Sequence, residues 1–257
     1  MMGVHHTAVV EDGAQLGEGV EIGAYCVVGA NVKLGAGTRL HSHVVIDGNT
    51  TIGSGCEIFS FACIGTQTQD LKYKGGKTYV KIGDRTTLRE YVTVNAGTND
   101  GECTAVGNDC HILAYCHVAH ACRVGNEVIM SNCATLGGDV VVEDQAIIGG
   151  LTGVHQFVRI GRLCMVGAMT RVSKDCPSFM IVAGSPAEVH GVNVVGMERR
   201  SLDKEARAAV KKAHRILYRE GLSTRQALEK IRSETDSCAE VDQLLEFIEG
   251  SERGIVK

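Results

Sequence analysis

The stretch QLGEGVEIGAYCVVGANVKLG, residues 15–35, carries an aliphatic side chain at every sixth position. The same period runs from Val4 to Ile64, resumes from Ile82 to Val94 and continues from Val106 to Val172. A six-residue period matches neither the turn of an α-helix nor the alternation of a simple strand. It is typical of a left-handed parallel β-helix, in which three hexapeptides form one triangular coil.

The position two residues before each aliphatic one favours the same fold. From Ala8 to Thr170 it holds a small or β-branched residue. Side chains two apart on a strand point the same way, so each hexad sends one large and one small side chain into a narrow prism. Glycine often follows the aliphatic residue, as at Gly17 and Gly23. We expect these glycines to turn the corners of the coil with positive φ.

Composition fits one soluble protein with an elongated aliphatic core. Tryptophan is absent, aromatic residues make up 4% and the formal net charge is −4. That charge gives no reason to expect nucleic-acid binding. No apolar run is long enough for stable membrane insertion and no signal peptide precedes the repeats. We therefore expect a cytoplasmic bacterial protein.

The eleven cysteines invite a disulfide or metal-binding interpretation, and three of them recur at equal spacing. However, six cysteines occupy the small inward position of the hexad, where a free thiol behaves as a small apolar side chain. We therefore expect free thiols, no metal site and no disulfides. The six are Cys26, Cys56, Cys110, Cys116, Cys122 and Cys164.

Two insertions interrupt the hexads, at residues 66–81 and 96–105, and loops on a rigid scaffold often carry function. The repeat ends at Cys176-Pro177, and the chain becomes helical after Gly196. We expect a β-helical domain over residues 1–190 and an α-helical domain over 191–257, which makes the fold all-β with an α tail.

The tail contains several helix signals. Ser201 is the expected cap of a helix that runs to about Arg219 and ends at Gly221. Two further capping boxes are expected, formed by Ser223 with Gln226 and by Ser237 with Glu240. The first helix is rich in Lys and Arg. Its basic residues form either a solvated face or a docking surface for an acidic partner.

Histidines suggest where chemistry takes place. With 18 residues in a coil, His120, Gly138 and Gln156 fall in one column, and His155 lies beside it. Adjacent coils are roughly 4.8 Å apart, so we expect His120 and Gln156 on one face with an open notch at Gly138. A base beside a free backbone N–H is the minimum for acyl transfer to a hydroxyl.

Specific segments add to these patterns: QDLKY at 69–73, HVAHAC at 117–122, GGLTGVHQF at 149–157, and GVN at 191–193 followed by Arg199-Arg200. With them the chain resembles the UDP-N-acetylglucosamine O-acyltransferases of lipid A synthesis over essentially its whole length. The resemblance implies a homotrimer with active sites between neighbouring subunits. It also implies an acyl carrier protein thioester as donor, a UDP-sugar as acceptor and no cofactor.

Residue roles follow from the resemblance. His120 would be the general base, Gly138 the oxyanion donor and Ala168 the residue that limits acyl-chain length. Paired arginines suit a diphosphate, because guanidinium binds phosphate oxygens bidentately. The implied substrate-binding residues are Gln69, Asp70, Lys72, His117, His155, Gln156, Asn193, Arg199 and Arg200.

The chain departs from the usual family pattern at four positions. Ala121 stands where an aspartate commonly follows the catalytic histidine, Asn95 and Asp139 replace histidines, and Val195 replaces a glutamate. The acceptor is therefore either UDP-N-acetylglucosamine or its 3-amino analogue. Other readings are a γ-type carbonic anhydrase with three histidines on zinc, a non-catalytic scaffold, and the related N-acyltransferase that acts later in lipid A synthesis.

Overall fold

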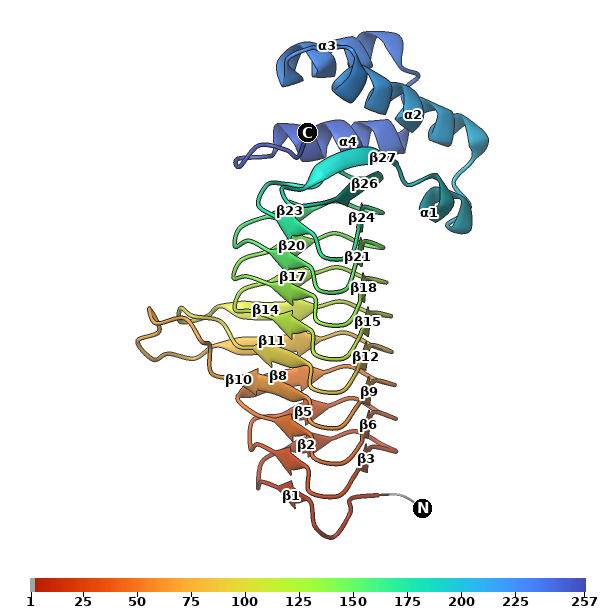
Figure 1. The fold of residues 1–257 in the computed structure, drawn as a ribbon. Helices are drawn as coiled ribbons and strands as arrows, with labels where there is room; N and C mark the ends of the chain where they lie inside the picture. The colour runs from red at the N-terminus through yellow and green to blue at the C-terminus, as the bar shows by residue number, and fades with distance from the viewer. Residues whose placement is uncertain (1–2) are drawn as a thin grey trace.

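A computed structural model describes residues 3–257 of the chain. Figure 1 shows a long triangular prism of short strands with a helical tail at one end. Strands pair in parallel with the strand one coil later, as Val9 with Val27 and Val27 with Val45. The fold is the left-handed parallel β-helix of hexapeptide repeats that the sequence predicts.

Three sheets form the faces of the prism. Sheet 1 contains β1 (Val9–Val10), β4 (Val27–Val28), β7 (Val45–Ile46), β10 (Cys63–Thr66), β13 (Thr93–Asn95), β16 (His117–Val118), β19 (Thr135–Leu136), β22 (Gly153–Val154) and β25 (Arg171–Val172). Sheet 2 contains β2 (Gln15–Leu16), β5 (Lys33–Leu34), β8 (Asn49–Ile52), β11 (Tyr79–Ile82), β14 (Cys103–Val106), β17 (Arg123–Val124), β20 (Val141–Val142) and β23 (Arg159–Ile160). Sheet 3 contains β3 (Glu21–Ile22), β6 (Arg39–Leu40), β9 (Glu57–Ile58), β12 (Thr87–Leu88), β15 (His111–Ile112), β18 (Ile129–Met130), β21 (Ile147–Ile148), β24 (Met165–Val166), β26 (Met180–Ala183) and β27 (Glu188–Val192).

The chain turns at three corners. The loop corner, between sheets 1 and 2, includes residues 119–122, 137–140 and 155–158. The polar corner, between sheets 2 and 3, includes residues 107–110, 125–128 and 161–164. The aromatic corner, between sheets 3 and 1, includes residues 23–26, 113–116 and 167–170. A left-handed residue recurs at each corner, for example Tyr25, Ala121 and Glu127.

The expected role of the glycines that follow the aliphatic residues is wrong. Gly17 and Gly23 do not lie in the left-handed region, which is reached two residues further on, at Gly19 and Tyr25. Instead, a Cβ on Gly17 would lie 2.6 Å from the backbone of Ala36 in the next coil. Glycine is used there because successive coils approach too closely for a side chain.

The core follows the hexads. The aliphatic and small inward positions are buried from Val20 to Val172, and the six inward cysteines are all buried and free. Burial raises the pKa of Cys110 and of Cys116 to about 11 and that of Cys122 to about 12. These thiols therefore stay protonated and pack as small apolar groups.

An exposed column of rings runs along the aromatic corner. Tyr25, His43, Phe61, Tyr91 and Tyr115 stack with centroid separations of 5.1, 5.0, 4.9 and 4.8 Å. Each ring lies one coil above the last, so the column has the spacing of the coils themselves. The stacked rings tie consecutive coils together on the outside of the prism.

Both insertions leave the prism at the loop corner, one between β10 and β11 and the other between β13 and β14. Figure 1 shows them projecting side by side. Lys77 N donates to Asp100 Oδ1 at 2.6 Å, and the Thr68 and Thr98 hydroxyl oxygens lie 3.3 Å apart. The two loops therefore support each other.

The prism is closed by β27, which pairs antiparallel with β26, and by the helices α1 (Val194–Arg199), α2 (Lys204–Arg219), α3 (Thr224–Glu234) and α4 (Ala239–Glu249). Their buried faces include Ile216 of α2, Ile231 of α3 and Leu244 of α4. No helix within residues 3–257 is long and apolar enough to cross a membrane.

The helix caps agree only in part with expectation. The capping box of Ser223 and Gln226 is present, and α2 ends before Gly221, which has a φ of 68°. The cap of α2 is Asp203, because Ser201 already takes a left-handed conformation after α1. The second box is absent: Cys238 begins α4 without a side-chain hydrogen bond.

Candidate active site

A hollow of about 450 Å³ lies at the loop corner, beneath the first inserted loop. Sheet 1 supplies its floor through the ends of β13 and β16, and the loop supplies one wall. The coil above adds Gln156. The lining residues are Gln69, Asp70, Leu71, Lys72, Asn95, His117, Ala119, His120 and Gln156. The hollow thus brings together six of the residues expected to act on or bind substrate.

The imidazole of His120 stands between two carboxylates. Its Nε2 lies 3.7 Å from Asp70 Oδ2, and its Nδ1 lies 3.9 Å from Asp139 Oδ2. Asp70 lines the hollow, whereas Asp139 lines a separate groove on the sheet 2 side. Nε2 is therefore the nitrogen that faces the hollow and is placed to accept a proton.

Gly138 lies directly against this ring. A Cβ there would be 2.2 Å from both Cε1 and Nε2 of His120. The notch expected at Gly138 is consequently filled by the imidazole, which extends along the prism axis toward the next coil. Within residues 3–257, the N–H of Gly138 has no hydrogen-bond acceptor. A buried unpaired donor beside a base is available to stabilise an oxyanion.

The inserted loop fixes Asp70 at the mouth of the hollow. Its Oδ1 accepts from Lys72 N at 3.0 Å and its Oδ2 from the Thr98 hydroxyl at 3.4 Å. The backbone hydrogen bond from Lys72 lowers the pKa of Asp70, and the positive charges nearby add to the effect. Asp70 is therefore ionised at neutral pH and oriented by its own loop.

His117 and Asn95 form the floor. Burial lowers the pKa of His117, and the neighbouring His120 lowers it further, so His117 is neutral at pH 7. Its Nδ1 lies 2.7 Å from the Thr93 hydroxyl. Asn95 donates from Nδ2 to Thr66 Oγ1 at 3.0 Å, while its buried Oδ1 has no partner in the described chain. The floor thus offers an unused acceptor.

His155 and Gln156 lie one coil above, both exposed. His155 Nδ1 lies 3.0 Å from the carbonyl oxygen of Gln156 and 3.3 Å from Arg253 Nη2. Arg253 was not singled out from the sequence, because nothing in its segment shows that the C-terminus returns to this corner. The contact adds a cation above the hollow.

The remaining expected residues lie elsewhere on the same chain. Arg200 pairs with Glu127, and Asn193 Nδ2 donates to the Leu163 carbonyl at 2.9 Å, so both are beside the polar corner. The Asn193 side chain also caps α1. Ala168 is exposed at the aromatic corner. One chain therefore separates His120 from Ala168 and from the arginines.

The basic face of α2 is partly neutralised. Arg207 pairs with Glu198, Lys212 donates to the Glu234 carbonyl, and Arg215 Nε lies 3.7 Å from a Glu220 oxygen. The charges of the other basic residues on this helix face solvent. The exposed ones among them are Lys204, Lys211 and Arg219.

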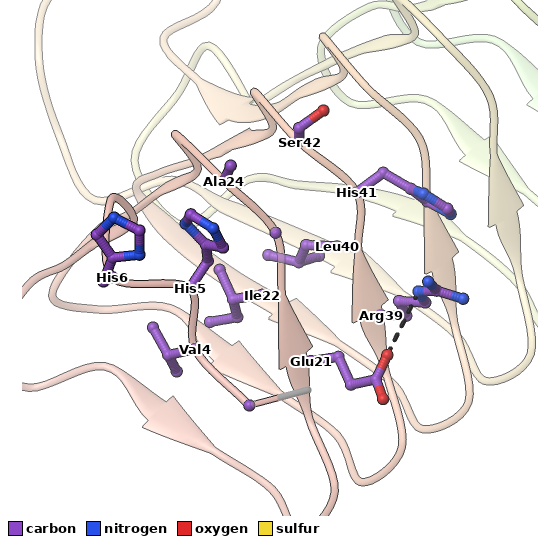
Figure 2. A pocket seen from close by; sticks show the side chains of 12 residues that line it. Val4, His5, His6, Glu21, Ile22, Ala24, Arg39, Leu40, His41 and Ser42 are labelled. Carbon is purple, nitrogen blue, oxygen red and sulfur yellow. Dashed lines mark ion pairs between the residues drawn. The ribbon is translucent and has the colours of Figure 1, made fainter. Parts of the chain in front are cut away.

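A second hollow of about 450 Å³ lies on sheet 3 near the first coils. Figure 2 shows His5 and His6 on one side of it and the Arg39–Glu21 ion pair on another. It contains none of the expected site residues. Among residues 3–257, no three His, Cys, Asp or Glu side chains converge as metal ligands would.

A prism of hexapeptide coils with a histidine and an inserted loop at one corner defines the class of hexapeptide-repeat transferases. The profile of bacterial transferase hexapeptide repeats matches residues 13–48 and 104–138. The profile described as UDP-N-acetylglucosamine O-acyltransferase, domain 2, matches residues 175–256. Both matches agree with the site geometry.

Relatives narrow the class. The acyl-[acyl-carrier-protein]–UDP-N-acetylglucosamine O-acyltransferase of Trichlorobacter lovleyi is 52% identical over 260 residues, and that of Thermodesulfovibrio yellowstonii is 46% identical over 255 residues, each covering at least 99% of both chains. The solved UDP-N-acetylglucosamine acyltransferase of Bacteroides fragilis has a TM-score of 0.97 at 35% identity, covering 99% of this chain and 100% of its own. The chain belongs to the UDP-N-acetylglucosamine O-acyltransferase family.

Proposed function

We propose that this protein transfers a 3-hydroxyacyl chain from acyl carrier protein to the 3-hydroxyl of UDP-N-acetylglucosamine, the first step of lipid A synthesis. The observation that carries the proposal is His120, with Nε2 facing the hollow and the unpaired N–H of Gly138 against the ring. A base and an oxyanion donor within reach of one point are what acyl transfer requires.

The chemistry follows from these positions. His120 Nε2 takes the proton of the sugar hydroxyl as the oxygen attacks the thioester carbonyl carbon. Negative charge then forms on the carbonyl oxygen, where the Gly138 N–H stabilises it. Collapse breaks the carbon–sulfur bond, and the imidazolium returns its proton to the departing thiolate. The reaction balances without a metal or a diffusible cofactor.

The other residues bind substrate in this proposal. Gln69, Asp70 and Lys72 hold the sugar from the inserted loop, and His117 contacts it from the floor. His155 and Gln156 contact the ligand from above. The paired Arg199 and Arg200 bind the diphosphate, Asn193 positions the segment that carries them, and Ala168 ends the acyl groove.

Three copies of the chain are needed to assemble such a site. His120 lies at the loop corner, whereas Arg200 lies beside the polar corner and Ala168 at the aromatic corner. We propose a homotrimer with parallel prisms, in which one subunit provides His120 and its neighbour provides the arginines. The free cysteines suit a reducing cytoplasm, and the division into domains 1–190 and 191–257 follows the change from coils to helices.

Incubation with acyl carrier protein thioesters and each of two sugar nucleotides tests the reaction. An ester product on UDP-N-acetylglucosamine is expected, cleaved by mild alkali. An alkali-resistant amide, formed only on the 3-amino analogue, would replace the proposed acceptor. Absence of both products would refute the proposal.

Mixed oligomers test the shared site. His120→Ala and Arg200→Ala chains are each expected to be weakly active alone. Random mixing at equal amounts should restore about a quarter of the wild-type sites, because each site takes its histidine and its arginine from different subunits. No recovery in mixed trimers of confirmed composition would refute the division of the site between subunits.

A further inference from the structure

The carboxylate of Asp139 lies on the far side of the His120 ring from the substrate hollow. We propose that Asp139 is the positioning residue that holds the His120 imidazole in the tautomer and orientation needed by the base, an inference that rests on the proposed function. Asp139 Oδ2 is 3.9 Å from Nδ1, an ion-pair distance. Contacts of this kind are often long in a free enzyme and tighten when substrate binds.

The backbone fixes the two residues relative to each other. Asp139 N donates to the His120 carbonyl at 3.0 Å, so the residues are locked together across adjacent coils. Asp139 has a φ of 60°, a conformation that Asp tolerates better than most residues. Within residues 3–257 its carboxylate has no other hydrogen bond or ion pair. The side chain is thus free to serve His120.

Asp70 cannot take the same role. Its carboxylate is already bound by Lys72 N and by the Thr98 hydroxyl, and it contacts Nε2, the nitrogen that must stay free for the proton. Asp139 instead faces Nδ1. A proton held on Nδ1 by an acceptor leaves the Nε2 lone pair directed at the substrate hydroxyl.

Ala121 explains why this carboxylate comes from the next coil. It follows His120 directly and lines the same groove as Asp139. Because alanine offers no acceptor, the groove behind the imidazole contains a carboxylate only through Asp139. An aspartate placed at 121 would enter the same groove, and its φ of 56° suits Asp. The two positions are therefore expected to be interchangeable.

Several other charges act on His120. Asp70 and Lys72 face it from the first loop, Glu102 from the second, and His117 from the preceding strand. Lys81 and Arg123 line the groove beside Asp139. Burial raises the pKa of Asp139, but its proximity to His120 opposes that rise. Since the other groups stay in place in an Asp139 variant, a change in pH dependence reports on this one contact.

Kinetics of Asp139→Asn, which keeps the shape and removes the charge, test the proposal. We expect kcat to fall about 10- to 100-fold, with little change in KM for the sugar nucleotide. The acid limb of the kcat/KM profile should move to lower pH by about one unit, because loss of the carboxylate disfavours the protonated ring. Adding Ala121→Asp to Asp139→Asn should restore kcat.

The matched control is Asp109→Asn. Asp109 also lies at a corner with positive φ and pairs with Arg85 at 2.7 Å, but on the polar corner. Its loss should leave kcat and the pH profile unchanged. An Asp139→Asn enzyme with wild-type kcat and acid limb, or one not rescued by Ala121→Asp, would overturn the proposal.

Nitrogen-15 NMR of labelled histidine decides the point without substrate. Comparison with His120→Gln assigns the His120 signal, which should show Nδ1 protonated in the wild type and a mixture of tautomers in Asp139→Ala. Identical tautomers in both would refute the positioning role even in an active enzyme. An enzyme inactive on UDP-N-acetylglucosamine with the expected tautomers would instead refute the proposed function.

Discussion

Gly138→Ala tests the steric relationship between the base and the coil above it. The new methyl carbon would lie 2.2 Å from Nε2 and Cε1 of His120, so the ring must move by about 1.2 Å to reach an ordinary contact of 3.4 Å. Gly138 does not lie in the left-handed region, so alanine fits the backbone without strain. The substitution thus acts chiefly on the position of the imidazole.

A misplacement of about 1 Å costs about 100-fold in rate, equivalent to about 2.7 kcal/mol in the activation free energy. Steady-state assays should therefore show kcat reduced about 100-fold, with KM for the sugar nucleotide changed little because the loop residues are untouched. Gly153→Ala is the control: its Cβ would meet no atom within 4 Å, so activity should persist. A folded Gly138→Ala trimer with kcat within twofold of wild type would show that the ring has room to move.

Three further predictions concern the base, the core and the acyl groove. His120→Ala should lower kcat by about 10²–10⁴ while the oligomer persists in light scattering; near-normal turnover would remove the assignment. The raised pKa values of Cys110, Cys116 and Cys122 predict that stability is intact below pH 8.5 and declines toward pH 11–12, because the unfolded chain loses these protons first. Urea titrations should show about 2 kcal/mol lost per thiol at pH 10, and a flat profile would contradict the burial argument. Ala168→Gly should lengthen and Ala168→Met shorten the preferred acyl chain in competition assays; equal preferences in both variants would show that the groove ends elsewhere.

The fold was predictable because the period of the hexads is itself the geometry of the coil. Once each aliphatic residue is placed inward, the register between coils follows, and His120, Gly138 and Gln156 fall at one corner without further information. The buried cysteines were predictable for the same reason. Periodicity determines the inward positions and the corners, so whatever depends on the repeat alone can be derived from the chain.

What the repeat does not determine was harder to foresee. The cap at Asp203 depends on how α1 ends at Ser201, and the contact of Arg253 with His155 depends on the path of the whole tail. The pairing of Asp139 with Nδ1 of His120 is a matter of side-chain direction across two coils. Such features arise from tertiary packing, which the spacing of residues in one chain does not encode.

The 18-residue register makes distance along this protein a counted quantity. From His120 to Ala168 the chain climbs two and two-thirds coils, which corresponds to about 13 Å at ~4.8 Å per coil. Deleting 18 residues between them would shorten that span by one whole step and leave every inward side chain in phase, whereas deleting one residue would turn the core outward. Evolution can therefore reset the reach of such an enzyme coarsely by gaining or losing coils and finely by changing a single side chain.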